Sequence, residues 1–320
     1  MDAVTRRRFL GAAVGATALL APRQAAADPR PLPHEAARGR PGPLCLFSKH
    51  LPGMDAPALG RTVKSLGFEG VDLTVRPGGH VAPERAAAEL PPFVEMLRGQ
   101  GAEVPMITTG LVSAEEAAAR AVLETAGRLR IPFFKPGYRR YAFADARREV
   151  ESAAAELRGL ARLSAECGVE LGFHNHAGYI GGPVWDIAPV IEGLDPRWVG
   201  YYFDVRHAVV EGGDAGWRAA LERVAPRLKM VAIKDFFWDK GPRGWRQRHC
   251  PLGEGMVDWK TFFAILARTS FRGPVSLHLE YEMTGTTAAA KQENTLAAAA
   301  RDLARLRAGL AEAYLPPGAS

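Results

Sequence analysis

The sequence lacks the features of several protein classes. Only three cysteines occur in 320 residues, which excludes a small fold held by a disulfide framework. No apolar run reaches the ~18 residues that a membrane-spanning helix needs, so we expect no membrane span. With 47% hydrophobic and 24% charged residues, the composition is that of an ordinary globular chain.

The main part of the chain also lacks a cluster of positive charge. The formal net charge is +6, but the first 27 residues contribute four arginines against one aspartate. The remaining basic and acidic residues nearly balance. Because binding to a phosphate backbone depends on a clustered positive face, we expect no nucleic-acid partner.

The first residues predict an export signal. The segment Thr5-Arg6-Arg7-Arg8-Phe9-Leu10 leads into an apolar stretch, and three alanines precede Asp28. A basic segment, an apolar segment and a small-residue cleavage site together are typical of a signal peptide, and the paired arginines resemble the twin-arginine signal of bacteria. We therefore expect a signal peptide over residues 1–27, a Pro/Arg-rich linker over residues 28–43, and a periplasmic or secreted protein.

The rest of the chain alternates short apolar segments with longer segments of helical period. The eight predicted strands are Leu44–Ser48, Val71–Val75, Val104–Thr108, Pro132–Lys135, Val169–Phe173, Val199–Phe203, Met230–Ile233 and Val275–Leu279. This alternation predicts an α/β fold with a parallel sheet. Eight such units in about 270 residues favour a single (β/α)8 barrel, a TIM barrel, over residues 44–315. A doubly wound open sheet is the alternative, but its fingerprint G-x-G-x-x-G is missing after the first strand.

Two helices have clear boundaries in the sequence. Apolar residues recur on one stripe between Asp145 and Cys167, with Asp145 as the predicted N-cap and Gly168 as the predicted C-terminal stop. A second long helical pattern runs from residue 288 to residue 313, where it would close the ring of helices. No feature of the sequence predicts an oligomeric state.

Polar residues gather where the predicted strands end. Six of the eight histidines lie there, together with lysines, acids and an arginine. In a TIM barrel the carboxyl ends of the strands all meet at one mouth, which carries the chemistry. The candidate residues are Lys49, His50, Arg76, His80, Lys135, Tyr138, His174, His176, Asp204, His207, Lys234, Asp235, His278 and Glu280. We expect them to form one site.

Four strand-end motifs carry a resemblance to a known family. They are Gly-Val-Glu-Leu-Gly-Phe-His174-Asn175-His176, Phe203-Asp204-Val205-Arg206-His207, Ile233-Lys234-Asp235 and Ser276-Leu277-His278-Leu279-Glu280. Together they resemble the xylose isomerase-like TIM barrels, which include sugar phosphate isomerases and epimerases and inosose dehydratase. The resemblance covers nearly all of the chain after the leader and implies a small-molecule carbohydrate substrate.

The resemblance also implies a metal site with one ligand missing. Members of the family hold one divalent metal through an acid, an aspartate, a histidine and a second acid. The matching positions here are His174, Asp204, Ala232 and Glu280, so we expect His174, Asp204 and Glu280 as ligands, with Ala232 in place of the usual histidine. Mn²⁺, Zn²⁺, Mg²⁺ or Fe²⁺ would suit such ligands. The alternative is a hydrogen-bonded polar cluster without metal.

The remaining strand-end residues have predicted roles in catalysis and binding. Lys234, Glu280 and His207 are the predicted catalytic residues, with Asp235 or Glu280 expected to hold Lys234. The predicted substrate-binding residues are Arg76, Lys135 and His176. Arg76 and Lys135 would contact a carboxylate or the hydroxyls of a sugar acid. Structural ion pairs are the alternative for Lys234, Arg76 and Lys135.

The long segment from Asp235 to Val257 predicts a lid. Structureless insertions of this length are usually functional, and Trp238 and Trp245 would form aromatic walls of a carbohydrate pocket. A small satellite core that pins the loop is the alternative.

These residues predict an exported enzyme that removes a proton next to the carbonyl of a sugar or sugar derivative, an isomerase or epimerase assisted by metal. Two alternatives share the pocket. One is a lyase or dehydratase acting on an oxidised glycoside, and the other is a non-catalytic barrel that binds carbohydrate.

Overall fold

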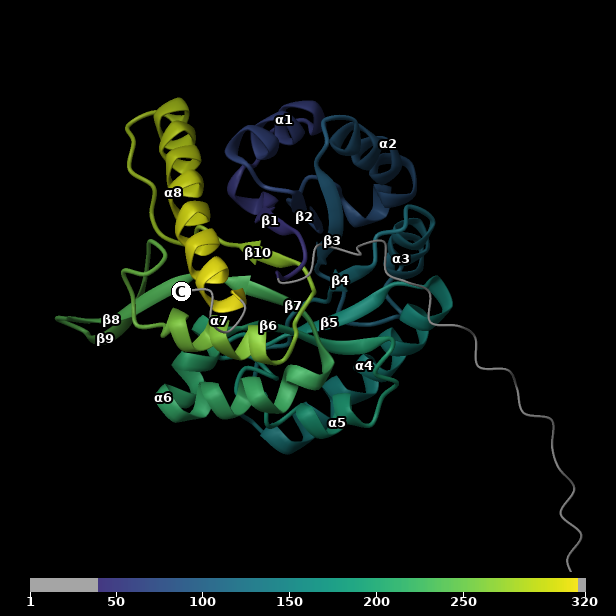
Figure 1. Cartoon of the computed structure of the whole chain (residues 1–320). Helices are drawn as coiled ribbons and strands as arrows, with labels where there is room; N and C mark the ends of the chain where they lie inside the picture. Colours follow the sequence, from purple (N-terminus) through teal and green to yellow (C-terminus); the bar gives the residue numbers. More distant parts are fainter. Residues whose placement is uncertain (1–39, 316–320) are drawn as a thin grey trace, which may run out of the picture. The chain divides into compact units, whose positions relative to one another are not determined.

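The computed structural model describes residues 40–315. These residues form a closed barrel of eight parallel strands with helices around it (Figure 1). The predicted signal peptide, residues 1–27, and most of the predicted linker lie outside the described residues. The barrel strands are β1 (Leu44–Phe47), β2 (Gly70–Val75), β3 (Glu103–Thr109), β4 (Phe133–Lys135), β5 (Glu170–His174), β6 (Val199–Asp204), β7 (Leu228–Ile233) and β10 (Val275–Leu277). The predicted (β/α)8 barrel is thus confirmed, and each predicted strand overlaps an observed one.

Helices follow the strands around the outside of the barrel. They are α1 (Ala56–Leu66), α2 (Ala86–Gly99), α3 (Ala119–Arg128), α4 (Ala146–Cys167), α5 (Ala188–Glu192), α6 (Val205–Val224), α7 (Trp259–Arg268) and α8 (Ala288–Tyr314). The predicted ends of α4 are confirmed: the Asp145 side chain accepts a hydrogen bond from the Arg148 amide, and Gly168 adopts a left-handed conformation with φ of 70°. Within residues 40–315 no helix is long and apolar enough to span a membrane.

The strands are buried on both faces because helices cover the outside and side chains fill the inside. In β2, Val71, Leu73 and Val75 pack in the large core between strands and helices. Side chains of successive residues in a strand point to opposite faces, so Asp72 and Thr74 point into the barrel. The polar residues of β2 are therefore those whose side chains point into the barrel.

The barrel interior has two layers. The lower layer is the apolar cluster of Met106, Phe133, Tyr202, Met230 and Ala232. Two residues further along the same strands, toward their carboxyl ends, the upper layer consists of Thr108, Lys135, Asp204 and Lys234. His174, the last residue of β5, lies beside them and stacks on Tyr202 with ring centroids 4.5 Å apart. The closed barrel therefore places these polar residues at one mouth.

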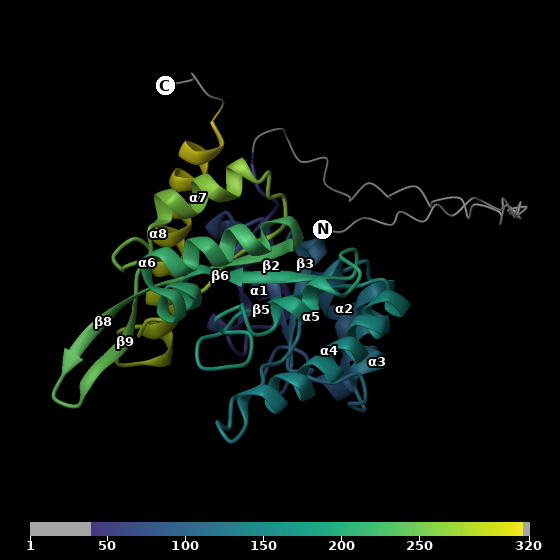
Figure 2. The ribbon, with the colours of Figure 1, turned by 90° about the horizontal axis from the view of Figure 1, so that it is seen from below.

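The segment after β7 differs from its prediction. Instead of a structureless lid, β8 (Asp235–Gly241) and β9 (Gly244–Cys250) form an antiparallel hairpin that extends away from the barrel strands (Figure 2). Gly244 at its turn has a φ of 95°, a conformation that suits glycine. The Asp235 carboxylate accepts hydrogen bonds from the backbone amides of Gly253, Gly255 and Val257. Asp235 thus fixes the loop after the hairpin and does not hold Lys234.

Candidate active site

Asp204 is the centre of the barrel mouth. As the last residue of β6 it points inward, and it also caps α6, because its Oδ1 accepts a hydrogen bond from the His207 amide at 3.1 Å. The Asn175 side chain holds the Asp204 backbone through two hydrogen bonds. Asn175 Oδ1 accepts from the Asp204 amide at 2.8 Å, and Asn175 Nδ2 donates to the Asp204 carbonyl at 3.0 Å. The carboxylate therefore has one defined position.

Three nitrogen atoms surround Oδ2 of this carboxylate. Lys234 Nζ lies at 3.0 Å, His174 Nε2 at 3.1 Å and His207 Nε2 at 3.7 Å. All four side chains are at most 5% exposed. The structure thus brings together residues at the carboxyl ends of three different strands, β5, β6 and β7, as the sequence predicted. We call His174, Asp204, His207 and Lys234 the Asp204 centre.

The charges in the Asp204 centre follow from its burial and its contacts. Burial acts to raise the pKa of Asp204, but the Lys234 charge and the two histidines outweigh it and hold that pKa well below its usual value. Burial also lowers the pKa of His174 and of His207 well below the usual value. At neutral pH the centre is therefore a carboxylate paired with an ammonium group, with two neutral imidazoles beside it.

Hydrogen bonds fix which nitrogen of His207 carries its proton. Arg206 Nη1 lies 2.9 Å from His207 Nδ1. A guanidinium group can only donate, so Nδ1 accepts and the proton of the neutral ring is on Nε2. This Nε2 is buried and has no hydrogen-bond partner among the described residues. The Asp204 centre therefore contains an unused hydrogen-bond donor.

His174 is constrained in the same way. Its Nε2 faces the ionised Asp204 carboxylate, which can only accept, so this nitrogen donates. Its Nδ1 lies 2.6 Å from the Tyr138 hydroxyl. Burial and the Asp204 charge raise the pKa of Tyr138 well above its usual value, so the hydroxyl keeps its proton and donates to Nδ1. The groups that face the Asp204 oxygen are thus hydrogen-bond donors.

The ligand atoms of His174, Asp204 and His207 lie within 4.8 Å of one another, which makes these residues a possible metal site. Their hydrogen bonds do not fit that use. A histidine that binds a metal normally donates a hydrogen bond from its second ring nitrogen to an acceptor, whereas Nδ1 of His207 accepts a hydrogen bond from Arg206. The Lys234 ammonium also lies on the Asp204 oxygen that a cation would take. Ala232, where the family has a histidine, is buried in the lower layer.

Glu280, predicted as both a ligand and a catalytic residue, lies apart from this possible metal site. Its carboxylate forms an ion pair with Lys49 at 2.9 Å, and its nearest histidine atom is His278 Nδ1 at 3.9 Å. Burial acts to raise the pKa of Glu280, but the charges of Lys234, His278 and Lys49 hold it well below its usual value. Glu280 is therefore an ionised group at the mouth, three residues beyond the end of β10. His207, and not Glu280, is the third member of the possible metal site.

A second polar cluster was missed in the sequence. Asp72, inside β2, accepts hydrogen bonds from three hydroxyl groups and lies 3.8 Å from a histidine ring nitrogen. The partners are Thr108 at 2.7 Å, Ser276 at 2.8 Å, Tyr202 at 3.2 Å and His278. An acid at an inward position of an otherwise apolar strand was the signal that could have found it, because buried carboxylates require partners.

The predicted substrate-binding residues lie in different environments. Lys135 is buried, with Nζ 3.3 Å from the centre of the Tyr138 ring. Arg76 is half-buried beside Phe47. The His176 ring packs against the His207 ring at a tilt, with centroids 3.9 Å apart, and its Nδ1 donates to the Ala177 carbonyl. These three residues belong to the mouth.

The two predicted aromatic walls do not join this group. Trp238 is 37% exposed and Trp245 is 64% exposed, and both belong to the β8–β9 hairpin. Lys240 covers the Trp245 ring at 5.8 Å. The structure thus places these rings on the surface of the hairpin.

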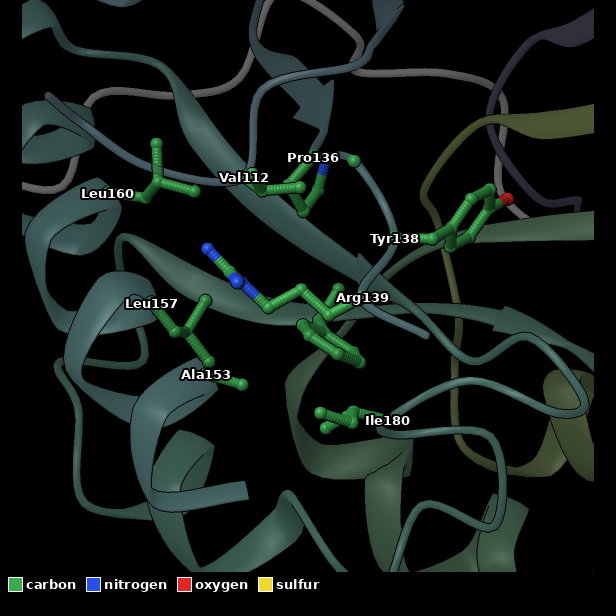
Figure 3. A pocket seen from close by; sticks show the side chains of 10 residues that line it. Val112, Pro136, Tyr138, Arg139, Ala153, Leu157, Leu160 and Ile180 are labelled. Carbon is green, nitrogen blue, oxygen red and sulfur yellow. The ribbon is translucent and has the colours of Figure 1, made fainter. Parts of the chain in front are cut away.

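An apolar hollow lies outside the mouth, between α4 and the loop after β4 (Figure 3). Leu157, Leu160 and Ile180 line it, and the Arg139 side chain crosses it to pair with Glu156. The Tyr138 ring points away from the other labelled residues. Of its lining residues, Tyr138 and Arg139 carry ionisable groups, and the Asp204 centre lies elsewhere, at the mouth.

Comparison with known proteins gives a family match that covers most of the chain. Residues 61–308 match the family described as Xylose isomerase-like TIM barrel. D-psicose 3-epimerase from Clostridium cellulolyticum H10, with D-tagatose, is similar with a TM-score of 0.64 at 14% identity, over 84% of this chain and 99% of that one. The 3-keto-D-glucoside 4-epimerase from E. coli gives 0.62 at 14% identity, over 83% and 98%.

A curated relative matches part of the sequence. Inosose dehydratase from Bacillus velezensis is 24% identical over 145 residues, which are 42% of this chain and 48% of that protein. The chain therefore spans about half the length of this relative. At these identities, the similarity to the two solved epimerases concerns the fold.

Proposed function

The chain belongs to the xylose isomerase-like TIM barrel family, and from that premise we propose that it is an enzyme that modifies a small sugar or sugar derivative. The proposed reaction begins with removal of a proton from the carbon next to a carbonyl group, as in an isomerase or epimerase. The observation that carries this proposal is the Lys234 ammonium group, held 3.0 Å from the fixed Asp204 carboxylate at the mouth.

The first step of such a reaction needs groups that stabilise negative charge on an oxygen atom. When the C–H bond breaks, its electron pair forms a C=C bond and the carbonyl oxygen becomes an enediolate oxygen. The Lys234 ammonium and the unpaired Nε2–H of His207 are donors that lie ready for this oxygen. Donors fixed before the reaction stabilise such an oxyanion without reorganisation.

The proton itself needs an acceptor, and the mouth has one on each side of the Asp204 centre. His176 has its proton on Nδ1, which donates to the Ala177 carbonyl, so its Nε2 lone pair is available. Glu280 is an ionised carboxylate. The barrel order β5-β6-β7-β10 places His176 and Glu280 on opposite sides of Asp204 and Lys234. One group would remove the proton and the other would return one to the opposite face, which supports epimerisation.

Elimination is the second candidate, favoured by the match to inosose dehydratase. It shares the proton removal, but the electron pair then expels a hydroxyl or alkoxyl group from the next carbon, and a C=C bond conjugated with the carbonyl remains. New ultraviolet absorbance with loss of water or an alcohol would identify elimination. Exchange of one carbon-bound hydrogen without loss of a group would identify isomerisation or epimerisation.

The test is incubation of the folded protein with keto- and aldoses in D₂O, followed by nuclear magnetic resonance. We expect deuterium at one carbon with wild-type protein and at least about 100-fold slower exchange with Lys234→Met, because loss of one oxyanion donor typically costs that much. The control is Lys64→Met, on the exposed surface of α1. No exchange with any sugar of the panel would contradict the proposal.

We propose that this step uses the Lys234 and His207 donors without a divalent metal. The metal expected from the family resemblance, Mn²⁺, Zn²⁺, Mg²⁺ or Fe²⁺, stays a prediction that elemental analysis of the purified protein tests. One equivalent of a metal bound at the mouth would contradict the metal-free proposal.

We also propose that the protein works outside the cytoplasm, supported by the twin-arginine motif at residues 5–10. A fusion of residues 1–35 to a reporter that is active only after export, with the Arg6→Lys/Arg7→Lys double variant as control, tests this. Export of the double variant at the wild-type rate would contradict twin-arginine transport.

A further inference from the structure

We propose that the substrate carries an anionic group, a carboxylate or a phosphate ester, and that Lys135 and Arg76 bind it at the end of β3. This proposal rests on the proposed function, because it names the chemical class of the substrate for the same mouth. Two basic side chains that have no acidic partner in the described part of the molecule support it.

Lys135 is a buried amine without a polar partner. It is the last residue of β4, and its side chain points into the barrel and is 2% exposed. Among residues 40–315 its Nζ forms no ion pair and no hydrogen bond, and it lies 3.3 Å from the centre of the Tyr138 ring. Burying an ammonium group without a partner is costly. The face of one aromatic ring offsets only part of that cost.

The charged neighbour that acts most strongly on Lys135 is another cation. Burial, and then the Arg76 charge, lower the pKa of Lys135 well below its usual value. Arg76 follows β2 and also has no acidic partner among the described residues, and its guanidinium lies 5.7 Å from the centre of the Phe47 ring. Burial and repulsion by Arg76 thus both disfavour the charged form of this amine in the free protein, and an anion bound between the two side chains would restore it.

Both side chains begin beside the end of β3. The hydroxyl of Thr109 donates to the Lys135 carbonyl at 2.8 Å. On the other side, the Arg76 Cβ lies 3.9 Å from the position that a Cβ on Gly110 would occupy. The end of β3 therefore lies beside both residues, and Gly110 adds no side chain next to Arg76.

The carboxylates of the mouth have other partners. Asp204 is paired with Lys234, and Glu280 is paired with Lys49. Asp72 accepts hydrogen bonds from the hydroxyls of Thr108, Ser276 and Tyr202. None of the three forms an ion pair with Lys135 or Arg76, so an anion from outside the described chain is the partner that the two cations fit. A carboxylate or phosphate suits both, because its oxygens accept bidentate contacts from a guanidinium and a further contact from an ammonium.

Stability separates a binding role of Lys135 from a structural one. A lysine in a structural ion pair stabilises the fold, so its loss would lower the melting temperature. A lysine kept for a ligand costs stability in the free protein. We therefore expect Lys135→Met, which keeps the length of the side chain, to raise the melting temperature of the free protein by about 2–4 °C while it weakens anion binding.

The experiment is calorimetry of the full chain with three probes of similar size: D-glucuronate, D-glucose 6-phosphate and neutral D-glucose. We expect at least one anionic probe to bind about 10- to 100-fold more tightly than D-glucose, because a charge-assisted hydrogen bond contributes this factor. Lys135→Met and Arg76→Met should each remove most of that preference. Lys64→Met, which removes an exposed lysine of α1, should leave it unchanged.

The outcomes separate this inference from the proposed function. A preference for glucuronate alone identifies a carboxylate substrate, and a preference for the phosphate ester alone identifies a sugar phosphate. Equal binding of charged and neutral probes, or a preference that survives Lys135→Met, overturns the anion site even if neutral sugars exchange deuterium. A Lys135-dependent preference without exchange of any sugar supports the anion site and overturns the enzymatic proposal.

Discussion

The two layers inside the barrel come from the same strands and differ in almost every property. Met106, Phe133, Tyr202 and Met230 fill the lower layer, and the residues two positions later, on three of these strands, are Thr108, Lys135 and Asp204. On these three strands the inward-pointing side chain is apolar in the lower layer and polar two residues later, in the upper layer. The lower layer fills the barrel interior, and the upper layer contains the groups of the proposed reaction.

The difference between the layers lies in how their groups are satisfied. Packing satisfies the lower layer except for the Tyr202 hydroxyl, which donates to Asp72, whereas each buried polar group of the upper layer needs a partner. Asp204 forms an ion pair with Lys234, and Asp72 accepts hydrogen bonds from three hydroxyl groups. The ammonium of Lys135 and the Nε2–H of His207 do not find acceptors among the described residues. These exceptions mark the places where a ligand would complete the site.

Breaking the pair at the Asp204 centre should have the largest effect. Asp204→Asn keeps the shape and the cap of α6 but leaves the Lys234 ammonium buried without an acid. We expect a loss of about 3–5 kcal/mol in the free energy of unfolding, together with loss of deuterium exchange. Urea denaturation measures the first effect. Asp214→Asn, on the exposed face of α6, should change stability by less than about 1 kcal/mol, and an equal loss in both variants would contradict the buried pair.

A cavity in the lower layer should affect stability without changing the chemistry. Met230→Ala removes a fully buried side chain, and such changes cost about 2–5 kcal/mol. The Asp204 centre keeps its donors, so the rate of deuterium exchange per folded molecule should stay within about threefold of wild type. Exchange that falls 100-fold in the folded variant would show that the two layers are not independent.

The pH dependence should show a smaller effect of the upper layer. Burial, and then the Lys234 charge, lower the pKa of His176 to about 4, against about 6.5 in an unfolded chain. Between these values the unfolded chain binds more protons. The contribution of His176 to stability is therefore constant above pH 6.5 and falls as the pH drops toward 4, by roughly 1 kcal/mol per pH unit. His174 and His207 act in the same direction.

The urea midpoint measured from pH 8 to pH 4 checks this prediction. His176→Gln should reduce the slope between pH 6.5 and pH 4 without changing it above pH 6.5. A midpoint that rises on acidification in this range would contradict neutral histidines in the upper layer.

The smallest effect is expected from metal ions. Because His207 Nδ1 accepts from Arg206 and Lys234 lies on Asp204, EDTA or 1 mM Mn²⁺ should change the melting temperature by less than about 1 °C. Binding with a Kd of 10 μM would instead stabilise the protein by about 2.7 kcal/mol at that concentration. A rise of several degrees with Mn²⁺ would therefore show that the histidines bind it.

The architecture could be predicted because its signals are local. Each buried strand leaves an apolar run, and Asp145 and Gly168 mark the ends of α4 through their own backbone and side-chain preferences. The hairpin after β7 was harder to predict. Its strands lie mostly in solvent and therefore lack a buried face to impose an apolar pattern.

The partners within the site were less predictable than its members. Strand-end position was enough to expect His174, Asp204, His207 and Lys234 at one mouth, because parallel strands end on the same side. It did not decide that Lys234 pairs with Asp204, that Glu280 pairs with Lys49, or that Asp72 lies at an inward position.

The amino-acid sequence by itself determined the eight strands, the helices between them and the set of polar residues at the mouth, since these depend on periodicity and on neighbours along the chain. Only the tertiary structure decided which nitrogen of His207 holds its proton and which cations have no acid beside them. Hydrogen-bond geometry and burial depend on distances of a few ångströms between residues that lie far apart in the sequence.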